Sequence, residues 1–470
     1  MSRKIPGHPL NQPAHNSIAA SGSEGRETWR RLAVVTLAAL AVRLIVMMFL
    51  YREQLVPAKD HWAFAYEIGR IARSIAEGHG ISSPLFADTG PSAWMTPVFP
   101  YFVAAVFKVF GIYTKASAFV LLTVDALTSA LTCIPIFFIA RRNFGLRVAK
   151  YSAWVWVVFP YGVYFPVERI WPTWLATLLL AVLFLLVLHL GETDSLWAWA
   201  GYGLLWAFAA LTEPTLLSVL PFVSGWACYR LLRRGKRWVA PAAVSAIVFI
   251  LVVAPWFVRN YRLFHQFIPF RDTMGLEWAI GNSGDSFHWR PREIGPWHNP
   301  AQWSEFEKLG ELKYMAEEKQ QAFHFIEGHW GWFARESVRR FVYVWTGFWS
   351  FNPRYLAQEP LDPPNVVFST AFTLLMLAGL WRAWKRGGSV AALYAMVLLV
   401  FPAIYYVTHP EVYYRREIDP LMLILAMVAV TRWKGAPQDA RVKSAGLPSA
   451  ERVEEAAVAR GSIRERGLAD

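Results

Sequence analysis

The sequence predicts an all-α polytopic membrane protein. Of its 470 residues, 55% are hydrophobic and only 17% are charged, whereas soluble domains average about a quarter charged residues. Apolar runs recur from Leu32 to Trp433, and many approach the roughly 20 residues that a helix needs to cross a bilayer. Because lipid cannot satisfy free backbone groups, these runs must form helices with internal hydrogen bonds.

The net charge of +13 is not a sign of nucleic-acid binding. The surplus Lys and Arg residues lie in short loops between apolar runs, where basic residues set the orientation of a membrane protein. Cys133 and Cys228 lie inside apolar runs, so we interpret both as small buried side chains without a disulfide or metal role. The predicted partners therefore include a membrane and no nucleic acid.

Composition divides the chain into a membrane domain, 31–433, and two polar tails, 1–30 and 434–470. The polar N-terminal tail is predicted to be disordered. Its basic residues directly before the first apolar run, 32–51, predict that this end is cytoplasmic. We expect that run to cross the membrane as a helix and not to be cleaved as a signal.

The first outer loop, about 52–114, is predicted to hold two helices that do not cross the membrane. Residues 60–77 have amphipathic helical spacing and end at Gly78, which is typical of an interfacial helix. The apolar run 101–110 is too short to span. If it crossed, the basic loop 141–147 would fall outside, so the charge rule keeps the run at the outer surface.

The same rule orders about ten transmembrane helices with both termini cytoplasmic. A second outer loop, about 259–364, contains helical spacing at 302–326 and an aromatic stretch at 341–351 that we interpret as interfacial. No internal repeat of the transporter kind is visible. The predicted spans are 32–51, 115–140, 148–167, 171–190, 196–212, 214–230, 238–257, 365–384, 390–408 and 417–433.

This topology brings charged residues from distant segments to the outer face. Charges near hydrocarbon are costly and are candidates for function. The set comprises Lys59, Asp60, His61, Glu67, Glu168, Arg169, Glu213, Arg259, Glu411, Arg415, Arg416 and Asp419, with Asn260 beside Arg259.

Several of these residues also have purely structural interpretations. Asp60 could cap the helix predicted to start there, and Glu168 and Arg169 could pair with each other. Glu213 could sit in a first helical turn, where acidic residues are favoured. Arg415 and Arg416 could anchor the interface, as could Tyr66 and many Trp residues. The histidines lack metal-ligand spacing, so no zinc site is expected.

The outer-face charges suit sugar transfer from a polyprenyl phosphate to an acceptor hydroxyl. A carboxylate must take the proton of the acceptor. Cations must hold the phosphate leaving group, and an apolar groove must receive the lipid tail. Outer carboxylates, outer arginines and a membrane scaffold supply all three.

Five groups of residues, in this order, resemble the bacterial GT-C glycosyltransferases over about 30–433. The resemblance is to the family-39-like branch, which groups protein mannosyltransferases, the lipid A aminoarabinose transferase and rhizobial lipopolysaccharide sugar transferases. The groups are Asp60, Tyr66 and Glu67 with 76–81, 96–101 and 109–111; the loop 141–145; Glu168; 254–260 with 274–275 and 281–282; and 414–420.

The resemblance implies roles for these residues. Asp60 would be the general base or would position the acceptor, and Glu168 would be the second acid of the site. Arg259 and either Arg415 or Arg416 would hold the donor phosphate. The remaining substrate-binding candidates are Lys59, Tyr66, Glu67 and Asn260.

Two departures from the family pattern matter. Glu213 stands before Pro214 where many relatives have a basic residue, and Asp60 lacks the adjacent acid of some relatives, which leaves Glu67 as the nearest second acid. No metal ligands can be named, although some enzymes of this type use a divalent cation.

The resemblance implies a glycosyltransferase, of hexosyl or pentosyl type, in the cytoplasmic membrane. Its donor would be a polyprenyl-phosphate sugar, and its acceptor a lipid, a glycan or a protein. A transporter or flippase of a lipid-linked sugar would share the spans but needs polar residues near mid-membrane. An interaction subunit with a decayed site would not need Asp60 and Glu168.

Overall fold

The structure is a computed structural model that describes residues 14–55, 64, 66–284, 294–297, 299–348, 353, 362–411 and 414–432. The predicted C-terminal tail lies outside these residues. Helix α1 extends from Ala14 to Leu50 and so begins within the segment predicted as the N-terminal tail.

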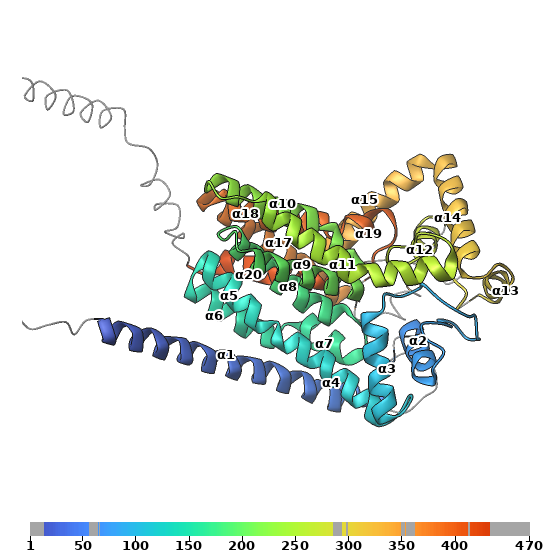
Figure 1. The fold of residues 1–470 in the computed structure, drawn as a ribbon, viewed down its shortest axis with the longest axis horizontal. Coiled ribbons are helices and arrows are strands. Elements are labelled where there is room, and N and C mark those ends of the chain that lie inside the picture. The colour runs from blue at the N-terminus through green and yellow to red at the C-terminus, as the bar shows by residue number, and fades with distance from the viewer. Residues whose placement is uncertain are drawn as a thin grey trace, which may run out of the picture.

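Long helices run side by side in one bundle (Figure 1), as expected for a polytopic membrane protein. Six helical segments are long and apolar enough to cross a membrane. Every predicted span coincides with a helix or with a broken helix. The bundle consists of α1, α4 (Lys115–Leu131) with α5 (Cys133–Phe144), α6 (Leu146–Val157) with α7 (Pro160–Glu168), α8 (Thr173–Leu190), α9 (Leu196–Thr212), η3 (Pro214–Ser218) with α10 (Leu220–Arg233), α11 (Val239–Phe264), α17 (Asp362–Arg386), α18 (Gly388–Val400) with α19 (Ala403–Val407), and η4 (Arg416–Ile418) with α20 (Asp419–Val430).

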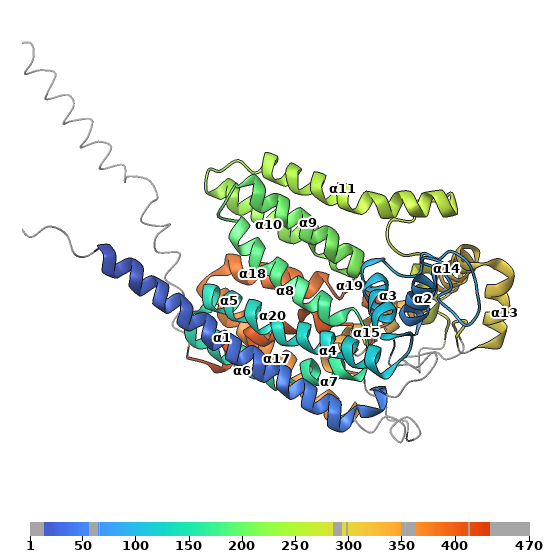
Figure 2. The same cartoon turned by 60° about the horizontal axis from the view of Figure 1, so that its bottom comes forward.

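Shorter helices gather beyond one end of the bundle, on the right in Figures 1 and 2. We call this the outer end, because it carries both predicted outer loops. The helices there are α2 (Glu67–Glu77), α3 (Val98–Phe110), α12 (Met274–Gly281), α13 (Pro300–Leu309), α14 (Glu311–Gly328) and α15 (Trp330–Thr346), with η1 (Arg52–Leu55) after α1. The 13-residue α3 packs against α2 and α4, in agreement with its predicted place at the surface.

The predicted start of the first outer helix is wrong. Helix α2 begins at Glu67, and its N-cap is Tyr66 with a φ of 39° and no capping side chain. The predicted capping residue, Asp60, lies outside the described residues. The predicted end is right: Gly78, at a φ of 97°, closes α2 through its N–H to the Ile75 carbonyl, a conformation that glycine adopts without strain.

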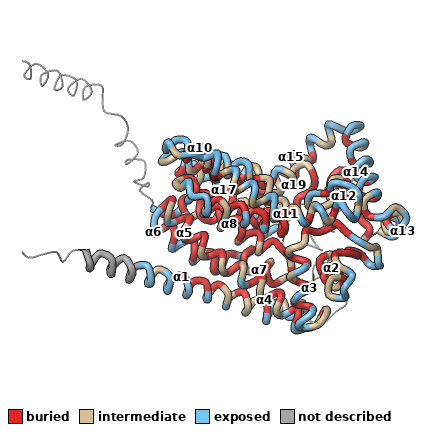
Figure 3. Tube along the Cα trace, viewed as in Figure 1, coloured by how far each residue is buried: buried red, intermediate tan, exposed pale blue. Residues whose placement is uncertain are grey.

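Two buried clusters hold the molecule together, and both appear as red tube in Figure 3. The larger lies within the bundle and joins α1, α5, α6, α8, α9, α17 and α20. The smaller lies at the outer end and joins α2, α3, α12 and α14 to α4 and α11. The outer helices are thus packed onto the spans through their own apolar core.

A buried arginine braces the break between α6 and α7. Arg43 of α1 donates from Nη2 to the Trp156 carbonyl at 3.2 Å and from Nη1 to the Val157 carbonyl at 3.3 Å. Its Nε donates to Ser129 Oγ at 2.9 Å, and Ser129 Oγ donates to the Gly162 carbonyl at 2.8 Å. Pro160 lacks the N–H that would bond to the Trp156 carbonyl, and Pro166 lacks the one that would bond to the Gly162 carbonyl, so Arg43 and Ser129 satisfy groups that lipid cannot.

Helix α11 stands at the side of the bundle, as Figure 2 shows. Only 22% of its most apolar window is buried, and its main neighbour is α9. The contact is close because α9 carries Gly203, where a Cβ atom would lie 2.2 Å from the Ser245 carbonyl oxygen of α11. Only glycine permits this approach.

Arg43→Met should lower the free energy of unfolding by about 3 kcal/mol, because it removes the buried hydrogen bonds of the guanidinium to the Trp156 and Val157 carbonyls and to Ser129. Thermal unfolding of the purified protein in detergent measures this loss. Arg147→Met, an exposed arginine on α6, is the matched control, with an expected change within about 0.5 kcal/mol. Equal stability of the two variants would contradict the bracing role of Arg43.

Candidate active site

Lys59, Asp60 and His61 lie outside the described residues. The chain enters the outer end again at Tyr66 and Glu67, at the start of α2. The Arg70 guanidinium lies over the Tyr66 ring, 5.1 Å from the centroid of the ring. Burial raises the pKa of Glu67, while Arg70, Arg169 and Arg271 lower it. Glu67 therefore lies in a basic surrounding close to the stretch that carries Asp60.

Three carboxylates from separate segments act on Glu277, and we call Glu67, Glu213, Glu277 and Glu411 the carboxylate cluster. Arg271 Nη2 lies 3.1 Å from Glu213 Oε2. Desolvation raises the pKa of Glu277 to about 7; Arg271 lowers it, and Glu411, Glu67 and Glu213 raise it. Arg271 acts on Glu67, Glu213 and Glu277 of this cluster, and Arg70 and Arg169 also act on Glu67.

The sequence placed Glu67, Glu213 and Glu411 at the outer face but did not single out Arg271 or Glu277. Glu213 lies between α9 and η3, so it is at a helix start as expected, and it also forms the ion pair with Arg271. Arg271 and Glu277 belong to the long outer loop, where no span end marks them. The nearby pair Met274 and Gly275, part of the family resemblance, was the only signal.

Glu168 and Arg169 lie at the end of α7, on the outer side. The charge of Glu168 acts on Tyr51 at the end of α1, and Tyr51 packs edge-on against Tyr164 at 5.3 Å. Arg169 is buried, acts on Glu67, and lies 5.1 Å from the Trp171 ring. Glu168 therefore borders the start of the first outer loop, and Arg169 borders the carboxylate cluster.

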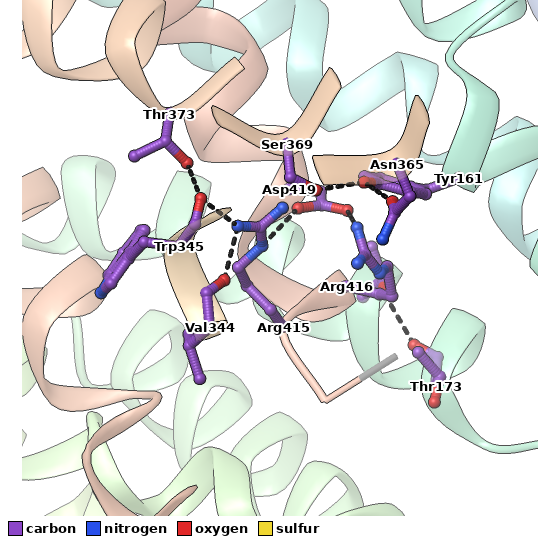
Figure 4. A network of polar contacts seen from close by, with 11 residues as sticks. Tyr161, Thr173, Val344, Trp345, Asn365, Ser369, Thr373, Arg415, Arg416 and Asp419 are labelled. Carbon is purple, nitrogen blue, oxygen red and sulfur yellow. Dashed lines mark hydrogen bonds and ion pairs between the residues drawn. The ribbon is translucent and has the colours of Figure 1, made fainter. Parts of the chain in front are cut away.

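Arg415 and Arg416 are both buried and share Asp419, as Figure 4 shows. Arg416 Nη1 lies 2.9 Å from Asp419 Oδ2, and Arg415 Nε lies 3.6 Å from Asp419 Oδ1. Arg415 Nη1 also donates to the Val344 carbonyl at 2.6 Å, and Arg416 lies 3.5 Å from the Tyr161 ring centroid. This burial differs from the interpretation of the two arginines as interface anchors.

A pocket of about 400 Å³, including its open mouth, adjoins this pair of arginines. Within the described residues, Nη2 of Arg415 is buried and has no hydrogen-bond acceptor. Two cations, one with an unused donor, therefore border a pocket that also touches the carboxylate cluster through Glu411. The lining residues are Tyr343, Val344, Gly347, Phe348, Asn365, Ser369, Tyr405, Pro410, Glu411, Tyr414, Arg415 and Arg416.

Arg259 and Asn260 hold an outer loop against α11. Arg259 Nη1 donates to the Ser92 carbonyl at 2.7 Å, and Nη2 donates to the Ile81 carbonyl at 2.8 Å. Asn260 Nδ2 donates to the Ile268 carbonyl at 3.0 Å. The structure thus groups these two predicted residues with the 81–92 loop and not with Arg415.

A buried pair of carboxyl groups fastens the same loop to α14. Glu311 Oε1 accepts from the Ala93 N–H at 2.6 Å and from Ser92 Oγ at 3.1 Å. Its carboxyl group also meets that of Asp272, and the two can bond only by sharing a proton. Burial raises the pKa of Asp272 to about 6, and burial together with Asp272 raises the pKa of Glu311 further.

Within the described ranges, no group of three or more His, Cys, Asp or Glu side chains could hold a metal ion. The carboxylate cluster is organised around a guanidinium instead. We therefore derive no step through a metal.

No protein-family model matches this sequence, and no curated protein matches it significantly. Among solved structures, the Archaeoglobus fulgidus oligosaccharyltransferase AglB, in complex with an inhibitory peptide and a dolichol-phosphate, has a TM-score of 0.50 at 12% identity. The match covers 86% of this chain and 50% of AglB, so the chain spans about half the length of that protein.

The chain shares the fold of this oligosaccharyltransferase. ArnT from Cupriavidus metallidurans, solved with undecaprenyl phosphate, also matches, with a TM-score of 0.38 at 16% identity over 84% of this chain and 76% of ArnT. At these identities the likeness concerns the fold alone. It confirms the fold class expected from the sequence, and with the six apolar helices it establishes a multi-pass membrane protein.

Asp272→Asn should flatten the dependence of stability on pH. In the unfolded chain, Asp and Glu release their protons near pH 4, whereas the buried pair keeps its protons to higher pH. The free energy of unfolding of the wild type therefore falls as the pH rises from about 4 to about 6. The variant has one carboxyl group fewer to ionise. The unfolding temperature of the variant minus that of the wild type should therefore increase as the pH is raised from 5 to 8.

Asp88→Asn is the control for this measurement. Asp88 accepts a hydrogen bond from Ser83 at 2.8 Å, and this bond and the Gly90 N–H lower its pKa. Its carboxyl group therefore stays ionised over the tested range. A parallel shift of both variants with pH would show that the Asp272–Glu311 pair is not the titrating group.

Proposed function

We propose that this protein is a glycosyltransferase that moves a sugar from a polyprenyl-phosphate-linked donor to an acceptor hydroxyl at the outer face of the cytoplasmic membrane. The observation that carries this proposal is the buried Arg415 guanidinium: its Nη2 has no hydrogen-bond acceptor among the described residues, and the residue lines the pocket. A buried cation with an unused donor suits an anion, because a charged hydrogen bond is about twice as strong as a neutral one. Arg416 adds a second positive charge.

The shape of the surroundings suits a lipid phosphate. The pocket lies at the outer end of the spans and is lined by aromatic residues, including Tyr343, Phe348 and Tyr405. These can cover an apolar chain while the arginines hold its phosphate. AglB, which has the same fold, was solved with a dolichol-phosphate, and this supports the same class of ligand here.

The reaction needs a base beside the phosphate site. In our proposal Asp60 takes the proton of the acceptor hydroxyl, with Glu168 near the start of the first outer loop and Glu67 at the start of α2. Lys59 and Tyr66 would assist in binding the substrates. The arginines stabilise the negative charge that develops on the phosphate as the bond between sugar and phosphate breaks. Arg259 and Asn260 would act indirectly, through the 81–92 loop.

The charged side chains inside the spans, among the residues that the structure describes, favour an enzyme over a transporter. Arg43 is fully buried and bound to backbone carbonyls. Asp125 of α4 is also buried and accepts from the Trp171 N–H at 3.1 Å. Both charges therefore stabilise helix ends, whereas a transport path needs polar groups that line it. Transport of labelled lipid without a transfer product would reverse this choice.

Arg415→Gln should weaken the binding of undecaprenyl phosphate about tenfold or more, since it removes a charge-assisted hydrogen bond. Titration of the detergent-purified protein measures the affinity. Arg339→Gln is the matched control, because Arg339 lies on α15 and pairs with Glu336 at 2.8 Å. Unchanged affinity in a folded Arg415→Gln variant would exclude Arg415 from the phosphate site.

Asp60→Asn should abolish sugar transfer and leave membrane insertion intact, because the amide cannot take the proton of the acceptor hydroxyl. Mass spectrometry of lipids and glycans from a deletion strain should show an accumulated sugar-phosphate lipid and a missing modification. The wild-type gene should restore the modification, and the Asp60→Asn gene should not. Restoration by the variant would remove Asp60 from the catalytic role.

A further inference from the structure

The turn between α19 and α20 brings a histidine between a carboxylate and a tyrosine. His409 Nδ1 lies 3.3 Å from Glu277 Oε2 on α12. On its other side, His409 Nε2 lies 3.4 Å from the Tyr414 hydroxyl. The His409 side chain is 9% exposed. The order of groups, a carboxylate, an imidazole and a hydroxyl, is one that can pass a proton along its length.

One end of this chain of groups reaches the phosphate pocket. Tyr414 lines the pocket together with Arg415 and Arg416, and its ring stacks on Tyr405 with centroids 4.7 Å apart. His409 lies behind Tyr414 and does not line the pocket. A phosphate held by the arginines would therefore meet the tyrosine hydroxyl and not the imidazole.

We propose that Glu277, His409 and Tyr414 form a proton-transfer chain that protonates the phosphate group leaving the donor. The inference rests on the proposed function, because it requires a lipid phosphate at Arg415. Tyr414 is the catalytic residue in this chain, since it faces the pocket. His409 acts through Tyr414, and Glu277 is a positioning residue that orients the imidazole.

The step balances as follows. The bond between the anomeric carbon and the phosphate oxygen breaks, its electron pair stays on the phosphate, and the acceptor oxygen forms the new bond to carbon. The acceptor proton goes to the base proposed above. The leaving monoester dianion takes the Tyr414 hydroxyl proton, and Tyr414 takes the Nε2 proton of the imidazolium. A neutral His409, a phosphate monoanion and an intact tyrosine remain, and water later restores the histidine proton.

The surroundings suit a protonated imidazole. Glu277 is the nearest acid, and Glu67, Glu213 and Glu411 lie around it with Arg271 as the opposing cation. When Glu277 is ionised, its negative charge 3.3 Å from Nδ1 favours the protonated imidazole. The arginines of the pocket cannot replace this chain, because guanidinium groups stay protonated and release no proton.

The test is the affinity of the full-length protein for undecaprenyl phosphate between pH 7 and 9. The phosphate is a dianion over this range, and the arginines stay charged. Wild-type affinity should fall with rising pH, approaching about tenfold per pH unit once His409 has lost its proton. His409→Gln and Tyr414→Phe should bind more weakly at pH 7 and show a flat profile.

Two controls separate this role from a structural one. His329→Gln makes the same change at an exposed histidine of the outer region and should keep the wild-type profile. Tyr414→Phe removes a single oxygen atom, and thermal unfolding checks that it stays folded. A purely structural effect would lower affinity equally at each pH.

The outcomes distinguish this inference from the proposed function. If His409→Gln or Tyr414→Phe keeps the wild-type slope, another group such as Glu277 titrates and the proton chain is overturned. The lipid-phosphate function would survive that result. If the wild type binds no undecaprenyl phosphate at any pH, the proposed function fails and the chain fails with it.

Discussion

The hydrogen bonds of Arg43 to the broken span are the interaction on which the site depends. The span formed by α6 and α7 is interrupted at Pro160, and a break inside hydrocarbon requires replacement donors. Arg43 supplies them to Trp156 and Val157. The break lets α7 end at Glu168 and lets Tyr161 pack under Arg416. The buried charge of Arg43 on α1 thus stabilises the break in the α6–α7 span, and this break places Tyr161 beside the pocket residue Arg416.

The outer end adds a second level of organisation. The outer helices share an apolar core with α4 and α11, whereas the pocket residues Val344, Tyr405 and Tyr414 belong to the core of the bundle. The 81–92 loop is tied down twice, by Arg259 and by Glu311. Glu411 belongs to both the cluster and the pocket lining. Acidic and basic halves of the candidate site are therefore continuous.

Apolar length predicted the spans, and the charge of the 141–147 loop correctly kept α3 at the surface. Local patterns could not reveal Arg43, because a single charge in an apolar run gives no sign of its partners. Nor could they reveal Arg271, Glu277 and His409, whose association depends on how α12 packs against the turn before α20. The start of α2 was misjudged because amphipathic spacing continued upstream of Tyr66. The roles of Lys59 and Asp60 stay predictions.

Helix α11 has a consequence for handling the protein. It is held mainly by α9, through the close approach at Gly203, and only 22% of its most apolar window is buried. Local unfolding starts where buried contacts are few, so delipidation should loosen this helix first. Because Arg259 joins its outer end to the 81–92 loop, such fraying would disorganise the first outer loop while the rest of the bundle stays folded. Inactivation would then precede denaturation.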